Sequence, residues 1–542
     1  MPTVRSAAVE EQARETSVDP AAAGRPSATE WLIVLAVVAV GGVLTAVAAR
    51  HMWFNADVWA YLAERETSID DILRPHAGHW TVWNAAVTRG LYLMEGMDFW
   101  PWWYLPRVLA WGLLCVVLWR LLRLLGTDRT ISLATVVVLA VFGSTGWLQG
   151  WTIGNPIAHM AAAGCAATVL VLEPANRNRL LLAGLLVLGV TSAGIGVAVL
   201  AGMALTVVAV RGARPWWPSV VGAGGIYGAW YVWYRWGEGG SGTDVSIGAL
   251  GDLPSFTFDM ARSAFTRLTA SPDWIGTLVV LALGVWLVAA MFKRRLSVVD
   301  TLYLGSAVAF LVLTLAVRVA AGAASPEAVR YSYTLTLFLI PVVLPRIPSL
   351  RHWTLKAAVL GLAGLLALHN LDDLRAEIEF WSDRSQSSRA VVETAAWLIN
   401  RDEGILSTAS VDSPRSGQLT AGGLATLVDD GWRPQPRTQA VGAARGNLRL
   451  ESRITDLEVG PCTDVGMSLM VDPMLGPLIL DGPADASAHI SWTDERGRGE
   501  LTVLLGDDGR RVLRFAEVPG ASVVVRPVAP ADQLRSCSLP TE

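Results

Sequence analysis

One acidic residue stands out by its surroundings. Asp57 lies shortly after the first long apolar run, within the aromatic-rich segment 53–59. A carboxylate in an aromatic niche at a membrane surface can act as a general base. The alternative is that Asp57 caps a short interfacial helix, which is a common use of this residue type. The sequence leaves both roles open.

Two histidines follow in the segment Arg74-Pro75-His76-Ala77-Gly78-His79. Histidines at this spacing beside an acid can bind a metal ion, so a divalent metal is one alternative, although the sequence requires no cofactor. The same side chains can hydrogen-bond a sugar or a phosphate, or serve structure alone. Arg74, His76 and His79 are therefore candidates for substrate contacts.

A further set of residues opens a later apolar run. Ser325 and Pro326 form a good helix start, and Arg330 and Tyr331 follow directly. Free N–H groups at a helix N-terminus, together with a guanidinium group, can hold a phosphate. Arg318, at the end of the preceding run, can assist. The alternative for both arginines is snorkelling to lipid headgroups.

Asn155 and His159 border another loop, in which tryptophans alternate with polar residues over positions 147–155. Such a mixture suits the faces of sugars, and it equally suits an aromatic belt at a membrane interface. The chain has no Walker loop, no paired CxxC, no Gly-x-Ser-x-Gly and no His-Glu-x-x-His motif.

The composition decides which elements must position these residues. The chain has 542 residues, of which 52% are hydrophobic and 17% are charged, with a net charge of −4. Soluble proteins average about 25% charged residues. This composition excludes an ordinary soluble enzyme, a disordered chain and a disulfide scaffold, and it gives no sign of a nucleic-acid partner.

Apolar runs long enough for membrane helices begin at Trp31. They lie at 31–49, 101–119, 131–147, 156–172, 180–193, 196–210, 216–234, 274–292, 299–317, 331–345 and 354–369. The runs 180–193 and 196–210 are short and are separated by Thr, Ser and Gly, which predicts two helices that meet at a break. The sequence therefore predicts a polytopic α-helical membrane protein with about eleven spans.

The distribution of basic residues predicts the topology. With residues 1–29 inside as a disordered cytoplasmic tail, Arg and Lys gather in the inside loops near 120–129, 177–179, 211–214, 293–295 and 346–356. Every short loop obeys the positive-inside rule except the outside loop around Gly322, which has Arg318 and Arg330 at its two edges. The chain is thus expected in the cell membrane as a multi-pass protein, with a cytoplasmic N-terminus and an extracytoplasmic C-terminal domain.

Three outer segments are expected beside the membrane domain at 30–370. The loops 50–100 and 235–273 carry amphipathic patterns typical of interfacial helices. Residues 371–542 are more polar, with a helix expected near 386–401 and alternating strands beyond it, which predicts an α+β, β-rich domain. Gly506-Asp507-Asp508-Gly509 predicts a hairpin turn. Cys462 and Cys537 both fall in this domain, so we expect a disulfide between them, the alternative being two free thiols.

The layout of residues 30–370 resembles the GT-C superfamily of integral-membrane glycosyltransferases. The resemblance rests on a first span followed by Asp57, a long first outer loop, many spans and an outer C-terminal domain. In that superfamily an acid in the first outer loop acts as the base or orients the acceptor, and the donor is a polyprenyl-phosphate sugar. The resemblance implies that Asp57 is the base and that Arg330 contacts the lipid phosphate. Many members carry two adjacent acids, whereas Ala56 precedes Asp57 here.

These observations predict an enzyme, a hexosyl- or pentosyltransferase, that moves a sugar from a lipid-linked donor to an envelope glycan, lipid or protein acceptor. The predicted reaction is an inverting displacement at the outer face, with Asp57 and Arg330 in a single pocket at the outer leaflet. A transporter or flippase of lipid-linked precursors is the main alternative, because transporters also use broken helices. A scaffold for envelope assembly is the third.

Overall fold

The computed structural model divides into two compact units. The helical unit comprises Met1–Arg50, Thr67–Gly90 and Pro101–Phe380, and the C-terminal unit comprises His51–Glu66, Leu91–Trp100 and Trp381–Glu542. The segment 50–100 is thus shared between the units. The structure describes residues 26–49, 52–54, 57–65, 68–76, 79–99, 102, 105–139, 157–172, 178–192, 194–237, 251–269, 271–292, 296–316, 329–399, 401, 405–412, 419–437, 440–441, 444, 447–448, 450–454, 461–471, 477–483, 486–494, 497–505, 510–515, 522–529 and 534–537.

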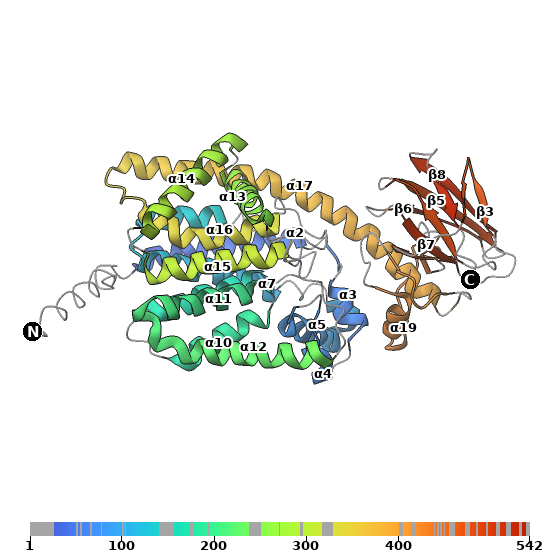
Figure 1. The fold of residues 1–542 in the computed structure, drawn as a ribbon, viewed down its shortest axis with the longest axis horizontal. Helices are drawn as coiled ribbons and strands as arrows, with labels where there is room; N and C mark the ends of the chain where they lie inside the picture. Colours follow the sequence, from blue (N-terminus) through green and yellow to red (C-terminus); the bar gives the residue numbers. More distant parts are fainter. Residues whose placement is uncertain are drawn as a thin grey trace, which may run out of the picture. The chain divides into compact units, whose positions relative to one another are not determined.

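The helical unit is built from apolar helices that lie side by side (Figure 1). They are α2 (Ala28–Ala49), α7 (Leu105–Leu124), a helix at Arg129–Leu139, α9 (Ile157–Leu172), α10 (Arg179–Val190), α11 (Gly194–Ala209), α12 (Trp217–Gly237), α14 (Asp273–Phe292), α15 (Val298–Thr314), α16 (Val329–Val343) and the first part of α17 (Trp353–Ile399). Amphipathic α4 (Ile69–Leu73), α5 (Val82–Glu95) and α13 (Leu253–Thr269), and the short 3-10 helices η1 (Gly96–Phe99), η2 (Arg211–Trp216) and η5 (Leu344–Arg346), connect them. A helix thus occupies at least part of each apolar run.

Two helices of the described chain, α14 and α17, are long and apolar enough to cross a membrane by length and composition. Five more, at Ala28–Leu44, Arg129–Leu139, Arg179–Val190, Gly194–Ala209 and Val298–Thr314, are apolar but shorter. The chain is therefore mostly helical, with two candidate membrane spans and a C-terminal β-sheet region.

Large apolar side chains cover the outside of these helices. On α14, Val285 is 72% exposed and Phe292 is 85% exposed, and on α17 Trp353 is 78% exposed. Contiguous apolar surface of this extent is unusual on a protein surrounded by water. Together with the two candidate spans, this exposed apolar surface suggests that the protein associates with a membrane.

The predicted break between α10 and α11 is confirmed. Helix α10 ends at Val190 and α11 begins at Gly194, after a turn at Thr191 and Ser192. The two helices then pack tightly, because a Cβ on Gly196 would collide with the backbone of Gly189 and would lie 2.6 Å from the nitrogen of Val190. Glycine at position 196 is what permits this approach.

Helices α11 and α15 also approach closely through small residues. A Cβ on Gly202 would lie 2.5 Å from the carbonyl oxygen of Leu302 and 2.6 Å from the nitrogen of Ser306. The hydroxyls of Thr206 and Ser306 donate to carbonyl oxygens of their own helices, four residues back. Small residues at such crossings let helix backbones pack by van der Waals contact, which is the main driving force between helices in lipid.

Charged residues join helix ends at several points. Glu30 forms an ion pair with Arg129, with 2.9 Å between Oε1 and Nε, beside its capping box with Ser27 at the start of α2. Asp300 completes the capping box of Ser297 at the start of α15 and pairs with Arg346 at 2.6 Å. These contacts join segments that the sequence assigns to the cytoplasmic side, and they fix the ends of neighbouring helices.

Helix α17 differs from the sequence prediction. A span at 354–369 and a separate helix near 386–401 were expected, whereas one helix of 47 residues covers both and passes through the expected domain boundary at 370. The physical reason is composition, because no Gly or Pro occurs between 365 and 399 to end the helix. The helix runs from the helical unit into the C-terminal unit.

The C-terminal unit contains α3 (Asp57–Ala63), the end of α17, α19 (Ala421–Asp429) and two antiparallel sheets (Figure 1). The strand orders are β1-β7-β4-β9-β2 and β3-β8-β5-β6. The strands are β1 (Leu450–Ile454), β2 (Cys462–Asp464), β3 (Leu469–Val471), β4 (Leu478–Asp481), β5 (Ser487–Asp494), β6 (Gly497–Leu504), β7 (Arg510–Phe515), β8 (Ser522–Ala529) and β9 (Arg535–Cys537). With β1 left out, the two sheets read β7-β4-β9-β2 and β3-β8-β5-β6. This is the strand order of an eight-stranded jelly roll, an architecture found in lectin domains.

The two sheets share one core. Leu513 of β7 packs with Ile490 and Trp492 of β5, and Val525 of β8 completes this group. The predicted hairpin at 506–509 is wrong as a pairing, because β6 pairs with β5 whereas β7 pairs with β1 and β4. The turn lies outside the described residues, but the chain changes sheets there. Each sheet must bury its apolar face against the other, and this requirement overrides the local turn signal.

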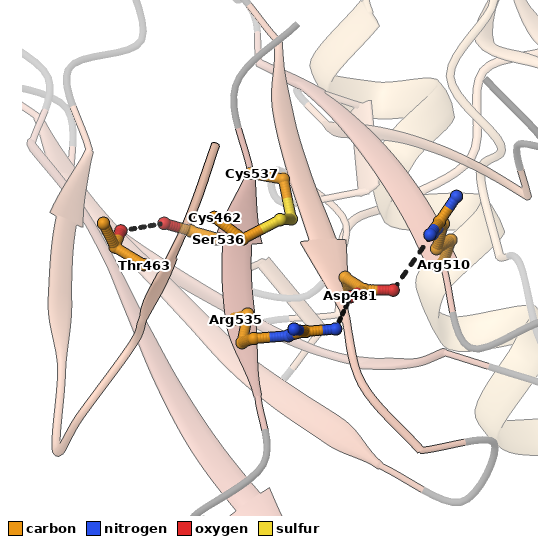
Figure 2. Close-up of a disulfide and its surroundings, with 7 residues drawn as sticks. All are labelled: Cys462, Thr463, Asp481, Arg510, Arg535, Ser536 and Cys537. Atoms are coloured by element: carbon orange, nitrogen blue, oxygen red, sulfur yellow. Dashed lines mark hydrogen bonds and ion pairs between the residues drawn. A yellow bond between two sulfur atoms is a disulfide. The ribbon is translucent and has the colours of Figure 1, made fainter. Parts of the chain in front are cut away.

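The predicted partners Cys462 and Cys537 are bonded to each other in the structure. They lie opposite each other on the antiparallel strands β2 and β9. Figure 2 shows Asp481 beside them, between Arg510 and Arg535, and its carboxylate pairs with both guanidinium groups. The disulfide and this ion-pair network connect β2, β9, β4 and β7 across one sheet.

A pair of glycine variants tests the packing of α11 against α15. We expect Gly202→Ala to destabilise the protein by about 1–3 kcal/mol, because the new methyl group meets the backbone of α15. Gly184→Ala in α10 is the matched control, since nothing lies within 4 Å of its Cβ position, and we expect it to be neutral or stabilising by up to about 1 kcal/mol. Thermal unfolding in detergent measures both, and equal behaviour would contradict the close crossing.

Candidate functional site

Helix α3 begins with Asp57, the acid that the sequence singles out. The side chain of Asp57 lies outside the described residues, but its neighbours are described. Trp53, Phe54 and Trp59 form a buried aromatic cluster, with the ring centroids of Trp53 and Trp59 5.1 Å apart. The aromatic niche predicted around Asp57 is therefore a packed cluster, which fixes the direction in which the chain enters α3.

The C-terminal unit holds α3 at both ends. At the start, the guanidinium of Arg389 on α17 lies 5.5 Å above the ring of Trp53, and Arg389 also pairs with Glu393 at 2.7 Å. At the end, a Cβ on Gly423 of α19 would lie 2.9 Å from the Cβ of Ala63. The backbone that carries Asp57 is thus positioned by residues more than three hundred positions later in the chain.

Arg74 ends the short helix α4 in the helical unit. Ser68 caps the start of this helix by accepting from the nitrogen of Asp71, and the Asp71 carboxylate lies 3.5 Å from the Arg74 guanidinium. The nitrogen of Arg74 donates to the carbonyl oxygen of Asp70. Arg74 is thus built into the end of α4, with its side chain partly exposed.

His76 and His79 face each other across a tight turn. Each backbone N–H donates to the carbonyl oxygen of the other at 2.9 Å. The ring of His79 lies against the first residue of α11, because a Cβ on Gly194 would be 2.9 Å from its Nδ1. His79 is therefore seated at the break between α10 and α11.

Aromatic residues of α12 fix the other side of this turn. The ring of Trp80 stacks on Trp230 with the centroids 4.8 Å apart, and Trp230 Nε1 donates to the carbonyl oxygen of Leu73 at 2.7 Å. The hydroxyl of Tyr234 donates to the carboxylate of Asp70 at 2.9 Å. These contacts, all within the helical unit, preorganise the segment from α4 to the start of α5.

Within the described residues, one group of three side chains could hold a metal ion. Cys462, Asp481 and Cys537 place ligand atoms within 4.8 Å of one another. Both sulfur atoms are joined in the disulfide and Asp481 pairs with two arginines. A metal could bind there only after reduction. The group does not include His76 or His79, where the sequence suggested the metal alternative.

The remaining candidates are described only in part. Asn155 and Arg318 lie outside the described residues, as do the side chains of His159 on α9 and Arg330 on α16. Tyr331 follows Arg330 at the start of α16, where its half-buried ring lies 6.2 Å from that of Phe310. The pocket proposed to contain both Asp57 and Arg330 stays a prediction.

A set of buried polar residues at the start of α5 and along it was not predicted from the sequence. Thr81, Asn84, Thr88 and Arg89 are each less than 10% exposed. Their spacing, at positions 1, 4, 8 and 9 of the segment, is the signal that could have identified them, because it places them on one face of a helix. Neither a known protein-family model nor any curated protein matches this chain.

The contact between Arg389 and Trp53 can be tested against a matched ion pair on α17. Arg389→Ala should lower stability by about 1 kcal/mol and increase hydrogen exchange of residues 52–65, because it removes the cation–π contact and the partly buried pair with Glu393. Arg375→Ala removes an exposed pair of the same spacing and should change neither quantity. Unchanged exchange in Arg389→Ala would contradict the role assigned to Arg389.

A second pair of variants tests the support of the histidine turn. Trp230→Phe keeps a stacking ring but removes the donor to Leu73, so we expect a loss of about 1 kcal/mol and faster hydrogen exchange at residues 70–80. Trp233→Phe on the same helix is the control, since Trp233 is 75% exposed. If both variants behave alike, the hydrogen bond does not position the turn.

Proposed function

We propose that the chain is a membrane glycosyltransferase that moves a sugar from a polyprenyl-phosphate donor to an acceptor at the outer face. One observation carries the proposal. The helix that begins with Asp57 belongs to the same compact unit as the jelly-roll sandwich. A sandwich of this type is common among carbohydrate-binding domains, so the acid and a fold suited to a glycan acceptor form one body.

We infer that the other apolar helices also span the membrane, giving about eleven spans with a cytoplasmic N-terminus. Two features support this topology. The contacts of Glu30 with Arg129, and of Asp300 with Arg346, join segments assigned to the inside. The contacts of His79 with Gly194 join segments assigned to the outside. A chain threaded alternately through a bilayer would have its contacts sorted in this way.

The proposed reaction is an inverting displacement. Asp57 takes the proton of an acceptor hydroxyl, and the acceptor oxygen forms a bond to the anomeric carbon. The bond between that carbon and the phosphate oxygen breaks, and the lipid phosphate leaves with the electron pair. A base within hydrogen-bond reach of the hydroxyl contributes roughly 10²- to 10⁴-fold to the rate of such a step.

The other candidate residues serve binding in this proposal. The N-terminus of α16 with Arg330, assisted by Arg318 and Tyr331, would bind the donor phosphate, as free N–H groups and guanidinium groups do at other phosphate sites. The polar groups suited to sugar hydroxyls are Arg74, His76, His79, Asn155 and His159. The acceptor would be an envelope glycan, lipid or protein, and the sugar a hexose or pentose.

The proposal is tested by Asp57→Asn in reconstituted membranes supplied with a radiolabelled polyprenyl-phosphate sugar. We expect sugar transfer to fall at least about 100-fold, because the amide cannot accept the proton. Asp373→Asn is the control, since Asp373 is largely exposed on α17 and far in sequence from the candidate residues. It should retain full transfer.

Two results would contradict the proposal. Transfer at the wild-type rate by Asp57→Asn would remove Asp57 as the base. Absence of donor turnover by the wild-type protein, together with movement of the labelled lipid between leaflets, would identify a flippase. The break between α10 and α11 is the observation that favours that second candidate, because transporters place substrate sites at broken helices.

A further inference from the structure

Helix α5 carries an apolar face along its whole length. The residues of this face recur at intervals of three and four positions, which places them on one side of the helix: Trp83, Ala86, Val87, Gly90, Leu93 and Met94. None of these six residues is buried, and Trp83 is 41% exposed, Leu93 66% and Met94 75%. The helix therefore presents an apolar surface to its surroundings.

The opposite side of α5 is polar and turned inward. Asn84 is 6% exposed, Thr88 is 1% exposed and Arg89 is 9% exposed. In water an amphipathic helix buries its apolar face and exposes its polar one, whereas α5 does the reverse. Its outer face therefore requires an apolar medium or an apolar partner.

Helix α12 of the helical unit has exposed tryptophans near both of its ends. Trp217 is its first residue and is 56% exposed, and Trp233, near its other end, is 75% exposed. These two positions lie about 24 Å apart along the helix axis, and exposed residues between them, such as Val221 and Ile226, are apolar. Exposed tryptophans at both ends of an apolar surface of roughly the thickness of a hydrocarbon layer are typical of aromatic belts.

The contacts of α12 place the start of α5 at the level of Trp233. Trp230, three residues before Trp233, stacks on Trp80 with the ring centroids 4.8 Å apart, and Trp80 lies two residues before α5 begins. From the same end of α12, the hydroxyl of Tyr234 donates to the carboxylate of Asp70 in α4. The apolar face of α5 thus begins beside the aromatic belt at this end of α12.

We propose that α5 is an in-plane membrane anchor whose apolar face, from Trp83 to Met94, lies among the acyl chains of the outer leaflet. A bilayer is the occupant that the rest of the helical unit indicates, because the candidate spans α14 and α17 expose apolar side chains as well. The one basic residue of α5, Arg89, is buried, so insertion depends on apolar area and not on attraction to anionic headgroups. The choice of leaflet rests on the proposed topology, whereas the contact with acyl chains rests on the exposed face of α5 and the belt of α12.

The anchor sets the depth of the segment that precedes it. An in-plane helix lies with its apolar face about 5–10 Å into the boundary between headgroups and acyl chains. The turn between His76 and His79 ends directly before Trp80 and is therefore held at the depth of the headgroups. The phosphate of a lipid-linked substrate lies at the same depth, so the anchor brings the candidate substrate contacts to it.

The test is a depth measurement on the full-length protein in phosphatidylcholine nanodiscs. A nitroxide is attached to Trp83→Cys, Leu93→Cys or Met94→Cys, and its collision rates with oxygen and with a water-soluble nickel chelate are measured by power-saturation EPR. We expect oxygen collisions to dominate at all three positions, because oxygen concentrates among acyl chains, with depths of about 5–10 Å. The native cysteines stay unlabelled, since two are buried and the other two form the disulfide.

Three further labels calibrate the measurement. Val285→Cys on α14 is the acyl-chain reference and Glu500→Cys on β6 is the water reference, because both native side chains are exposed. Glu95→Cys is the matched control on α5 itself, since Glu95 is exposed but lies about 100° around the helix from Met94. We expect the nitroxide at Glu95 to lie shallower than the one at Met94.

Nickel accessibility on the apolar face of α5 equal to that at Glu500 would overturn the proposal. Low accessibility to both reagents would overturn it as well, because protein, such as a second copy of the chain, would then cover the face. A depth that changes when phosphatidylglycerol is included would contradict insertion by apolar area. If one variant does not fold, the other two positions decide the question.

The measurement separates this proposal from the others. Water accessibility at both Val285 and Met94 would refute the membrane topology together with the anchor, whereas water accessibility at Met94 alone would refute only the anchor. Sugar transfer is not part of the measurement, so a failure of transfer with the labels of α5 in lipid would overturn the proposed function and leave the anchor intact.

Discussion

The helices expose apolar side chains on their outer faces, and these side chains must be kept out of contact with water. The rest of the structure depends on this condition. Side chains such as Val285 and Phe292 are exposed on α14, one of the two candidate membrane spans, and a hydrocarbon environment would remove their contact with water. At the helix ends, charged groups find partners, as Glu30 does with Arg129 and Asp300 with Arg346.

The segment 50–100 contributes to both units, and contacts within each unit explain why its short helices form at all. Helices of five to seven residues such as α4 and α3 are not stable alone. Tertiary contacts supply their stability: Trp230 and Tyr234 hold α4, while Arg389 and Gly423 hold α3. Residues on this loop therefore have fixed positions within each unit, which is a requirement for any site that binds or reacts.

Much of this architecture could be predicted from the sequence. The helices follow from the apolar runs, and the break before Gly194 follows from the placement of small residues and glycine. The disulfide between Cys462 and Cys537 follows from their shared place in one predicted domain. The structure contains all three features. Helix α17 and the connection from β6 to β7 could not be predicted, because continuity and sheet pairing depend on long-range packing that overrides local signals. The polar face of α5 escaped notice because Thr and Asn have no single function, and only their burial makes them informative.

The central claim is that Asp57 serves as the base for sugar transfer at the outer face. A cryo-EM map of the protein with a non-transferable polyprenyl-phosphonate sugar and an acceptor tests it most directly. The account predicts the Asp57 carboxylate at hydrogen-bond distance, about 2.6–3.2 Å, from an acceptor hydroxyl that faces the anomeric carbon. An anomeric carbon whose nearest carboxylate belongs to another residue, with Asp57 turned toward lipid, would contradict it.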